Sequence, residues 1–165
     1  MRNPETKIMT LAQALAWRAE LRKTGVPLVA TNGCFDILHR GHAEYLARAR
    51  TLGGALLLAV NDDASIRAIK GPTRPVNPEE DRAYVLASLE SVDAVVVFKT
   101  QTATPLLEAV RPDIYAKGGD YTIDTIVQEE RRALEAFGCQ IVILPAVPGR
   151  STTNTLKKLA DCQEK

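Results

Sequence analysis

The stretch PLVATNGCFDILHRGH, residues 27–42, decides the fold and indicates where the site lies. Its first four residues form an unbroken apolar run, as in a buried parallel strand. The only two histidines of the sequence, His39 and His42, follow on either side of Gly41. A helix that begins here would aim its backbone N–H groups and the positive end of its dipole at an anion. We therefore expect a strand, an anion-binding turn and a helix, with a nucleotide phosphate as the anion.

Similar apolar runs recur along the chain and alternate with helical patterns. The expected strands are 27–30, 55–60, 92–98, 114–116 and 141–144. The expected helices are one from a capping box at Thr10 and Gln13 to Gly25, then 42–52, 78–89 capped by Asn77, 105–110 and 125–137. This alternation predicts a single-domain α/β fold, a doubly wound, Rossmann-like parallel sheet of about five strands with flanking helices. Residues 1–25 are expected to form an N-terminal helical segment packed on a domain of residues 26–165.

The composition argues against several classes of protein. Lys and Arg number 21 and Asp and Glu 20, so the net charge of +1 gives no general attraction to nucleic acid or to a membrane surface. The cysteines Cys34, Cys139 and Cys162 are widely spaced and odd in number, which disfavours a disulfide framework or a thiolate zinc site. Residues 1–10 are polar, and no run reaches the roughly 18 apolar residues of a membrane span. We expect a soluble cytoplasmic protein.

The H-x-G-H pattern at 39–42 takes the place of the two best-known phosphate loops, G-x-x-x-x-G-K-[ST] and G-x-G-x-x-G, which the chain lacks. Gly41 allows a phosphate to approach the backbone, and the two imidazoles can donate hydrogen bonds to its oxygens. A metal site is the alternative, because Cys34, Asp36, His39 and His42 lie within nine positions. The helix opening favours a phosphate, so no protein metal site is expected.

Several cations follow other predicted strands. Lys70 begins the proline-rich segment 70–78, an ordered or lid-like loop, and Lys117 ends a strand; each could bring a positive charge to a phosphate, although either could be an ordinary surface lysine. Arg74 and Arg82 share this reasoning more weakly. Arg82 lies on a predicted helix, where a pair with Glu79 is the alternative to phosphate contact.

Polar residues supply the remaining candidates. The run Ser151, Thr152 and Thr153 precedes a helical pattern, so it can cap that helix and also donate to an anion. Asn61 and the two aspartates after it could bind a ribose or magnesium ion, or one aspartate could cap the next helix. Asp36 could bind substrate hydroxyls, hold an imidazole, or bond its own backbone in a turn.

These motifs resemble those of a known family. TNGCFDILHRGHAEYL at 31–46 resembles the signature of the cytidylyltransferase-like nucleotidyltransferases. IKGPTRP at 69–75, RPDIYAKGGDY at 111–121 and GRSTTN at 149–154 resemble, more narrowly, the heptose 1-phosphate adenylyltransferases of lipopolysaccharide-core synthesis. The likeness covers nearly the whole chain from Thr10 onward, so residues 26–165 are read as the nucleotidyltransferase domain. That family's domain is often fused to a ribokinase-like heptose kinase; with no room for one here, we expect a stand-alone form that works with a separate heptose kinase and phosphatase.

The resemblance implies a reaction and roles for residues. The reaction would transfer AMP from ATP, with Mg²⁺, to D-glycero-β-D-manno-heptose 1-phosphate, giving ADP-heptose and pyrophosphate. The expected catalytic residues are His39, His42 and Lys117. The expected nucleotide-binding residues are Gly33, Cys34, Phe35, Gly41, Gly118, Asp120, Ser151, Thr152 and Thr153. The expected substrate-binding residues are Asn32, Asp36, Asn61, Lys70, Arg74, Arg82 and Tyr121. By the same analogy the protein forms a homodimer or a higher homo-oligomer.

The chemistry requires little more than positioning and charge. A phosphate monoester has a second pKa of about 6, so the sugar phosphate is already an anionic nucleophile near neutral pH and needs no strong general base. Three other functions stay open. They are a cytidylyltransferase acting on glycerol 3-phosphate or another polyol phosphate, a non-catalytic nucleotide-binding module, and a metal-binding regulator.

Overall fold

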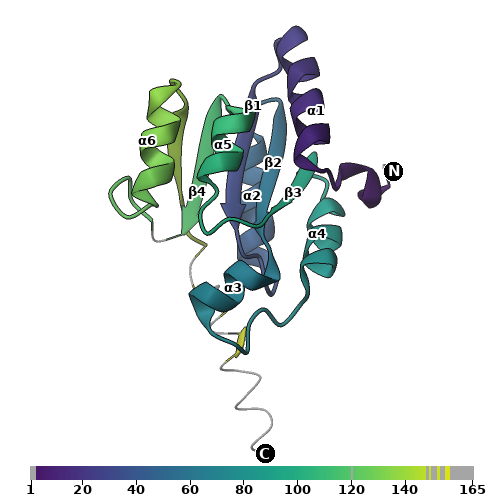
Figure 1. Ribbon diagram of the computed structural model, residues 1–165, viewed down its shortest axis with the longest axis vertical. Helices are drawn as coiled ribbons and strands as arrows, with labels where there is room; N and C mark the ends of the chain where they lie inside the picture. Colours follow the sequence, from purple (N-terminus) through teal and green to yellow (C-terminus); the bar gives the residue numbers. More distant parts are fainter. Residues whose placement is uncertain (1–2, 120, 148, 150–151, 153–154, 157–165) are drawn as a thin grey trace, which may run out of the picture.

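A computed structural model describes residues 3–119, 121–147, 149, 152 and 155–156 (Figure 1). Within them, five parallel strands form one sheet in the order β3-β2-β1-β4-β5. The strands are β1 (Leu28–Gly33), β2 (Ala55–Asn61), β3 (Ala94–Phe98), β4 (Ile114–Gly119) and β5 (Gln140–Pro145). The predicted fold class, a doubly wound parallel α/β sheet of five strands in a single domain, is confirmed.

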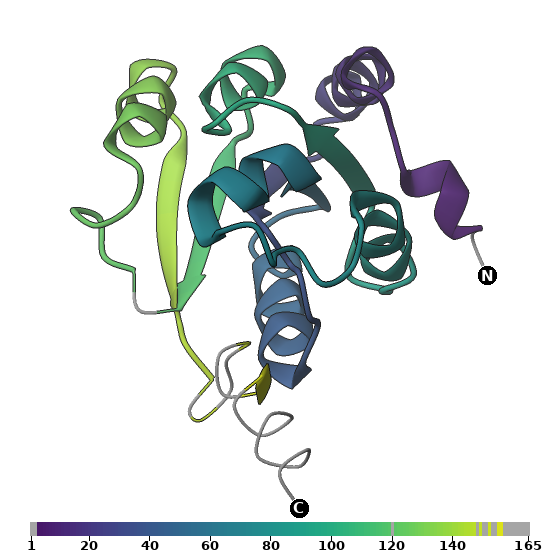
Figure 2. The same ribbon diagram turned by 60° about the horizontal axis from the view of Figure 1, so that its bottom comes forward.

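Helices cover both faces of the sheet (Figures 1 and 2). They are α1 (Leu11–Lys23), α2 (Arg40–Arg50), α3 (Asp63–Lys70), α4 (Glu79–Ala87), α5 (Thr104–Val110) and α6 (Gln128–Ala136), after a short 3-10 helix η1 (Pro4–Lys7). One apolar cluster joins Ala14, Leu107 and Leu134 of α1, α5 and α6 to one face of the sheet. A second cluster joins Leu46 of α2 and Leu86 of α4 to the opposite face. The core therefore consists of two layers with the sheet between them.

The order of the strands creates a crevice beside the motif. From β1 the chain moves outward through β2 to β3, and then returns to β4 on the other side of β1. Within the described chain, β1 pairs with β4 only at Val29 and Ala30, opposite Ile114 and Tyr115. Beyond that point the two strands are unpaired toward their carboxyl ends, which leaves space at the switch point where ligands bind in such sheets.

Local capping explains where several helices begin. At Thr10 both halves of the predicted capping box are present: its hydroxyl accepts from Gln13 N at 3.3 Å, and its own N–H donates to Gln13 Oε1 at 2.8 Å. Asp62 caps α3 by accepting from Ser65 N at 2.8 Å, which selects the capping alternative for that aspartate. The predicted Asn77 cap of α4 is wrong, because the N-cap position is Pro78 and the Asn77 side chain bonds elsewhere.

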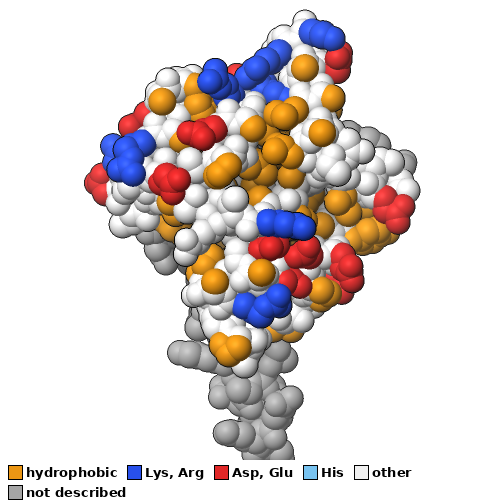
Figure 3. All heavy atoms as spheres, in the orientation of Figure 1, with side chains coloured by type: hydrophobic (Ala, Val, Ile, Leu, Met, Phe, Trp, Pro, Cys, Tyr) orange, Lys and Arg blue, Asp and Glu red, His pale blue; other side chains and the backbone are white. Residues whose placement is uncertain are grey.

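The surface is mixed in charge. On the face seen in Figure 3, basic and acidic side chains lie near one another with hydrophobic side chains between them, in keeping with the net charge of +1. In the part of the chain that the structure describes, no helix is long and apolar enough to cross a membrane.

Candidate active site

The turn between β1 and α2 brings the two histidines together. His39 is the N-cap residue of α2, with extended backbone angles and no side-chain capping bond. The rings of His39 and His42 stack with their centroids 3.9 Å apart, and Phe35 packs edge-on against His42 at 5.5 Å. Phe35 adopts a left-handed φ of 46°, which places its ring over this pair as the chain leaves the strand. The predicted strand, turn and helix unit is therefore present, with both imidazoles at the helix N-terminus.

Burial makes His42 a neutral donor. The pKa of His42 is lowered to about 4, mainly by desolvation and to a smaller extent by the nearby charges of His39 and Lys70. At neutral pH the imidazole is therefore uncharged and can donate through one ring nitrogen. Its Nδ1 atom is buried and has no hydrogen-bond partner in the described part of the chain. A phosphate bound here would supply negative charge that favours the protonated form.

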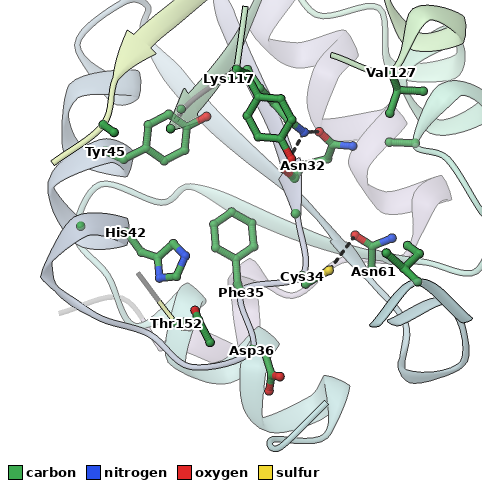
Figure 4. Close-up of a pocket in the computed structure, with 18 of the residues that line it drawn as sticks. Asn32, Cys34, Phe35, Asp36, His42, Tyr45, Asn61, Lys117, Val127 and Thr152 are labelled. Carbon is green, nitrogen blue, oxygen red and sulfur yellow. Dashed lines mark hydrogen bonds between the residues drawn. The ribbon is translucent and has the colours of Figure 1, made fainter. Parts of the chain in front are cut away.

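A cavity of about 530 Å³ opens beside this turn at the carboxyl ends of the strands (Figure 4). Most of the predicted site residues line it. They are Asn32, Gly33, Cys34, Phe35, Asp36, His39, Gly41, His42, Asn61, Lys70, Lys117, Gly118, Tyr121 and Thr152. The predicted residues Asp120, Ser151 and Thr153 lie outside the described residues. The structure thus gathers residues from five separate segments around one pocket.

Lys117 forms the wall opposite the histidines. Its ammonium donates to Asn32 Oδ1 at 2.6 Å and to the Asn32 carbonyl at 3.2 Å. The residue is only 9% exposed, and burial lowers its pKa, an effect opposed by the charges of Glu130 and Cys34. A buried ammonium held on the cavity surface is an electrostatic partner for a phosphate that enters.

Glycine is required at position 118, directly after that lysine. A Cβ at this position would lie 2.4 Å from the ring of Tyr45. Tyr45 cannot easily move, because its hydroxyl donates to Ala116 O at 2.9 Å and is 2.6 Å from Thr31 Oγ1. Gly118 of the 111–121 motif therefore reflects close packing between β4 and α2, beside the pocket, whereas Gly119 adopts a left-handed φ of 104°.

Asp36 and Arg74, two of the expected substrate-binding residues, are paired with each other. The Asp36 carboxylate is paired with the Arg74 guanidinium and accepts from Val76 N at 2.7 Å and Asn77 N at 3.2 Å. In Figure 4 it points away from the middle of the cavity. Arg74 is not among the residues that line the pocket. Both side chains thus fasten the proline-rich loop to the β1–α2 turn, and their contact with a substrate stays a prediction.

Arg82, for which a phosphate contact is predicted, is held by several protein partners. It is 2% exposed and lies outside the pocket lining, where it donates to Cys34 O at 2.7 Å and Asn77 O at 3.0 Å. Its guanidinium pairs with Asp63 at 2.7 Å and not with Glu79, so the alternative pairing with Glu79 is wrong, while the phosphate contact stays a prediction. Arg82 therefore stabilises the turn between β1 and α2 that carries the two histidines.

Smaller polar contacts complete the opposite side of the pocket. Asn61 ends β2, and its amide contacts Ser65 Oγ at 3.4 Å and the Cys34 thiol at 3.9 Å. Lys70 is the last residue of α3, so the helix and not the loop carries it to the pocket. Thr152 lines the cavity and contacts Ile37 O at 3.5 Å.

Sequence reasoning missed several lining residues. The segment after β3 contributes three residues, and others come from α2, α3, the ends of β3 and β4, the end of β5 with the two residues after it, and the start of α6. The full set is Tyr45, Ile69, Phe98, Gln101, Thr102, Ala103, Gly119, Val127, Glu130, Pro145, Ala146 and Val147. The segment after β3 could have been found, since the carboxyl ends of parallel strands share one edge of the sheet. Glu130 lies in the charged run EERR at 129–132, which is typical of an exposed helix face and gives no such signal.

A doubly wound sheet with stacked imidazoles at a helix N-terminus and a buried lysine across the cavity defines an α/β protein with an anion-binding pocket at its switch point. The family model described as cytidylyltransferase-like matches residues 30–162, and the chain belongs to that family.

Relatives with curated names give a narrower likeness. The chain is 48% identical over 154 residues to the bifunctional protein HldE of Methylobacillus flagellatus, covering 93% of this chain and 31% of that protein. It is 51% identical over 144 residues to the bifunctional protein HldE of Mesorhizobium japonicum, covering 87% and 28%. The chain thus spans about three tenths of the length of these relatives.

Two solved structures share the fold. A lipopolysaccharide core biosynthesis protein from Thermoplasma volcanium has 27% identity and a TM-score of 0.62, over 74% of this chain and 98% of that one. A pantoate-β-alanine ligase from Francisella tularensis, complexed with an ATP analogue and β-alanine, has 14% identity and a TM-score of 0.59, over 88% and 68%. The second likeness concerns the fold alone.

Proposed function

We propose that this chain is a nucleotidyltransferase that transfers AMP from ATP to D-glycero-β-D-manno-heptose 1-phosphate, producing ADP-heptose and pyrophosphate. The observation that carries the proposal is the placement of His39, His42 and Lys117 around one cavity at the switch point. The likeness to proteins named HldE and to a lipopolysaccharide core biosynthesis protein supports the choice of substrate. ATP and a sugar phosphate both carry the anionic groups that such a pocket would attract.

The triphosphate is assigned to the N-terminus of α2. There the helix dipole, the backbone at Gly41 and the two imidazoles converge on one point. Lys70 lies close enough to lower the pKa of His42, so its charge acts on the same region. This side of the pocket would therefore bind the pyrophosphate that becomes the leaving group.

The reaction is a direct displacement. An oxygen of the sugar phosphate attacks the α-phosphorus of ATP, a new P–O bond forms, and the bond to the β-phosphate oxygen breaks with release of pyrophosphate. The sugar phosphate is already ionised near neutral pH, so no side chain has to remove a proton. The protein contributes by aligning the two anions and by stabilising charge on the leaving group.

Magnesium enters this proposal as part of the ATP substrate. The carboxylates of described residues that line the cavity are Asp36 and Glu130, and both accept several hydrogen bonds from the protein. Among the described residues, no group of three or more His, Cys, Asp or Glu could hold a metal ion. Such a pocket suits a Mg²⁺ held mainly by phosphate oxygens and water. Heptose kinase and phosphatase activities in the same pathway, and assembly as a homodimer or a higher homo-oligomer, belong to the same proposal.

Pyrophosphate release tests the proposal directly. Purified protein with Mg²⁺ is given ATP or CTP, each with the heptose 1-phosphate or with glycerol 3-phosphate. Release with ATP and the heptose phosphate alone is expected. Release with CTP and glycerol 3-phosphate would instead establish the second candidate, a polyol-phosphate cytidylyltransferase, which the family description favours. Binding of ATP without release in any combination would indicate a non-catalytic module.

A further inference from the structure

Glu130 is a buried carboxylate that the proposed reaction does not use. It lies on α6, is 1% exposed and lines the cavity with Asn32 and Lys117. A carboxylate removed from water is costly unless hydrogen bonds and opposite charge compensate it. The groups that donate to the Glu130 carboxylate therefore identify the parts of the pocket that Glu130 holds in place.

Three hydrogen bonds join Glu130 to three walls of the pocket. Its Oε1 accepts from Asn32 Nδ2 on β1 and from the Ala103 N–H before α5, each at 2.9 Å. Its Oε2 accepts from the Tyr115 hydroxyl on β4, also at 2.9 Å. One side chain of α6 thus links β1, β4 and the segment after β3 at the edge where the cavity opens.

The bond to Asn32 fixes the group that holds Lys117. Asn32 Oδ1 accepts from the Lys117 ammonium at 2.6 Å, while its Nδ2 donates to Glu130. An amide has one accepting end and one donating end, so only this orientation satisfies the ammonium and the carboxylate together. Glu130 therefore determines the orientation of the amide, and the amide determines where the ammonium lies.

We propose that Glu130 is a positioning residue: through Asn32 it holds Lys117 at the cavity surface, and its negative charge compensates the buried ammonium. This role of Glu130 depends on the proposed function only where it predicts an effect of Glu130 variants on turnover. The charge of Glu130 also raises the pKa of Lys117 against the desolvation that lowers it. Of the residues that the structure describes, the other titratable groups facing this ammonium are Cys34, Tyr115 and Tyr121, with Tyr45 close to Tyr115.

Glu130→Gln separates charge from packing. A glutamine Oε1 can keep the bonds from Asn32 and Ala103. Its Nε2 would donate to the Tyr115 oxygen, whose proton can turn to Asn32 Oδ1, 2.6 Å away. The variant therefore retains the network and loses only the charge. Glu135→Gln, on the exposed side of the same helix, is the matched control.

The decisive measurement is the pKa of Lys117, determined by an NMR titration of protein labelled with ¹³C at lysine Cε. The Lys117 signal is assigned by its loss in Lys117→Arg. Glu130→Gln should lower this pKa by on the order of one unit, and the alkaline limb of kcat/KM should move by the same amount. Glu135→Gln should leave both unchanged. An unchanged Lys117 pKa in Glu130→Gln would overturn the proposal.

Two further results distinguish failure of this inference from misfolding of the variant and from failure of the proposed function. If Glu130→Gln does not fold, Glu130→Asp retains the charge on a shorter side chain; the Lys117 pKa should then stay near its wild-type value while kcat falls. If the pKa of Lys117 in Glu130→Asp instead falls as far as expected for the neutral side chain of Glu130→Gln, the inference is contradicted. If the wild-type protein releases no pyrophosphate with any acceptor, the proposed function fails, and the titration of Lys117 still decides the role of Glu130.

Discussion

The contact between Asp36 and the proline-rich loop gives a sharp prediction for Asp36→Ala. The Asp36 side chain is 1% exposed and that of its partner Arg74 is 15% exposed, so the pair is largely removed from water. The carboxylate also accepts from the N–H groups of Val76 and Asn77. Removing one partner of a buried ion pair costs about 3–5 kcal/mol, because the other charge is left uncompensated. We therefore expect Asp36→Ala to lower the free energy of unfolding by about 3–5 kcal/mol.

Urea denaturation followed by circular dichroism measures this loss. With an m-value of about 2 kcal/mol/M, the expected change corresponds to a midpoint about 1.5–2.5 M lower than that of the wild type. Asp124→Ala is the control, because this side chain is 82% exposed and its pair with Arg131 should contribute at most about 1 kcal/mol. An unchanged urea midpoint in Asp36→Ala, together with a raised KM for the sugar phosphate, would refute the structural role of Asp36 and favour its role in substrate binding.

Three further predictions concern the pocket. His39→Ala and His42→Ala should each lower kcat for pyrophosphate release by about 10²–10³ while the thermal midpoint stays near that of the wild type, and wild-type turnover in both would contradict the assignment. Gly118→Ala should destabilise the protein by about 1–3 kcal/mol, measured in urea, because the new Cβ meets the Tyr45 ring. Without ligand, the stability contributed by His42 should be fully present above about pH 6.5 and fall by about 3 kcal/mol as the pH drops to 4, because the unfolded chain takes up the proton first. Urea titrations at pH 7.5, 5.5 and 4 should show a smaller loss for His42→Gln than for the wild type.

The sequence was sufficient for the fold because its signals are local and repeated. Unbroken apolar runs at 27–30 and 55–60 can be buried only with helices on both faces, and the caps at Thr10 and Asp62 mark where helices begin. Parallel strands also bring their carboxyl ends to one edge. The grouping of His39, His42 and Lys117 around one pocket therefore follows from the order of elements alone.

The roles of individual charged residues could not be obtained in that way. Asp36 belongs to a motif and Arg82 to a predicted helix, yet their partners Arg74 and Asp63 lie 38 and 19 positions away and meet them only in the folded chain. Glu130 shows the opposite case, because its run of charges predicts an exposed surface although tertiary packing buries it. A motif indicates that a residue type is needed, and the three-dimensional contacts decide whether it faces ligand or supports the residues that do.

The central claim is that the pocket joins AMP to a sugar 1-phosphate. Its most direct test is ³¹P NMR of a reaction containing the wild-type protein, Mg²⁺, ATP and D-glycero-β-D-manno-heptose 1-phosphate. We expect loss of the sugar monoester signal and equal growth of a coupled pair of pyrophosphate diester signals and of inorganic pyrophosphate. A spectrum in which the monoester persists, or in which ATP yields only ADP and orthophosphate, would contradict it.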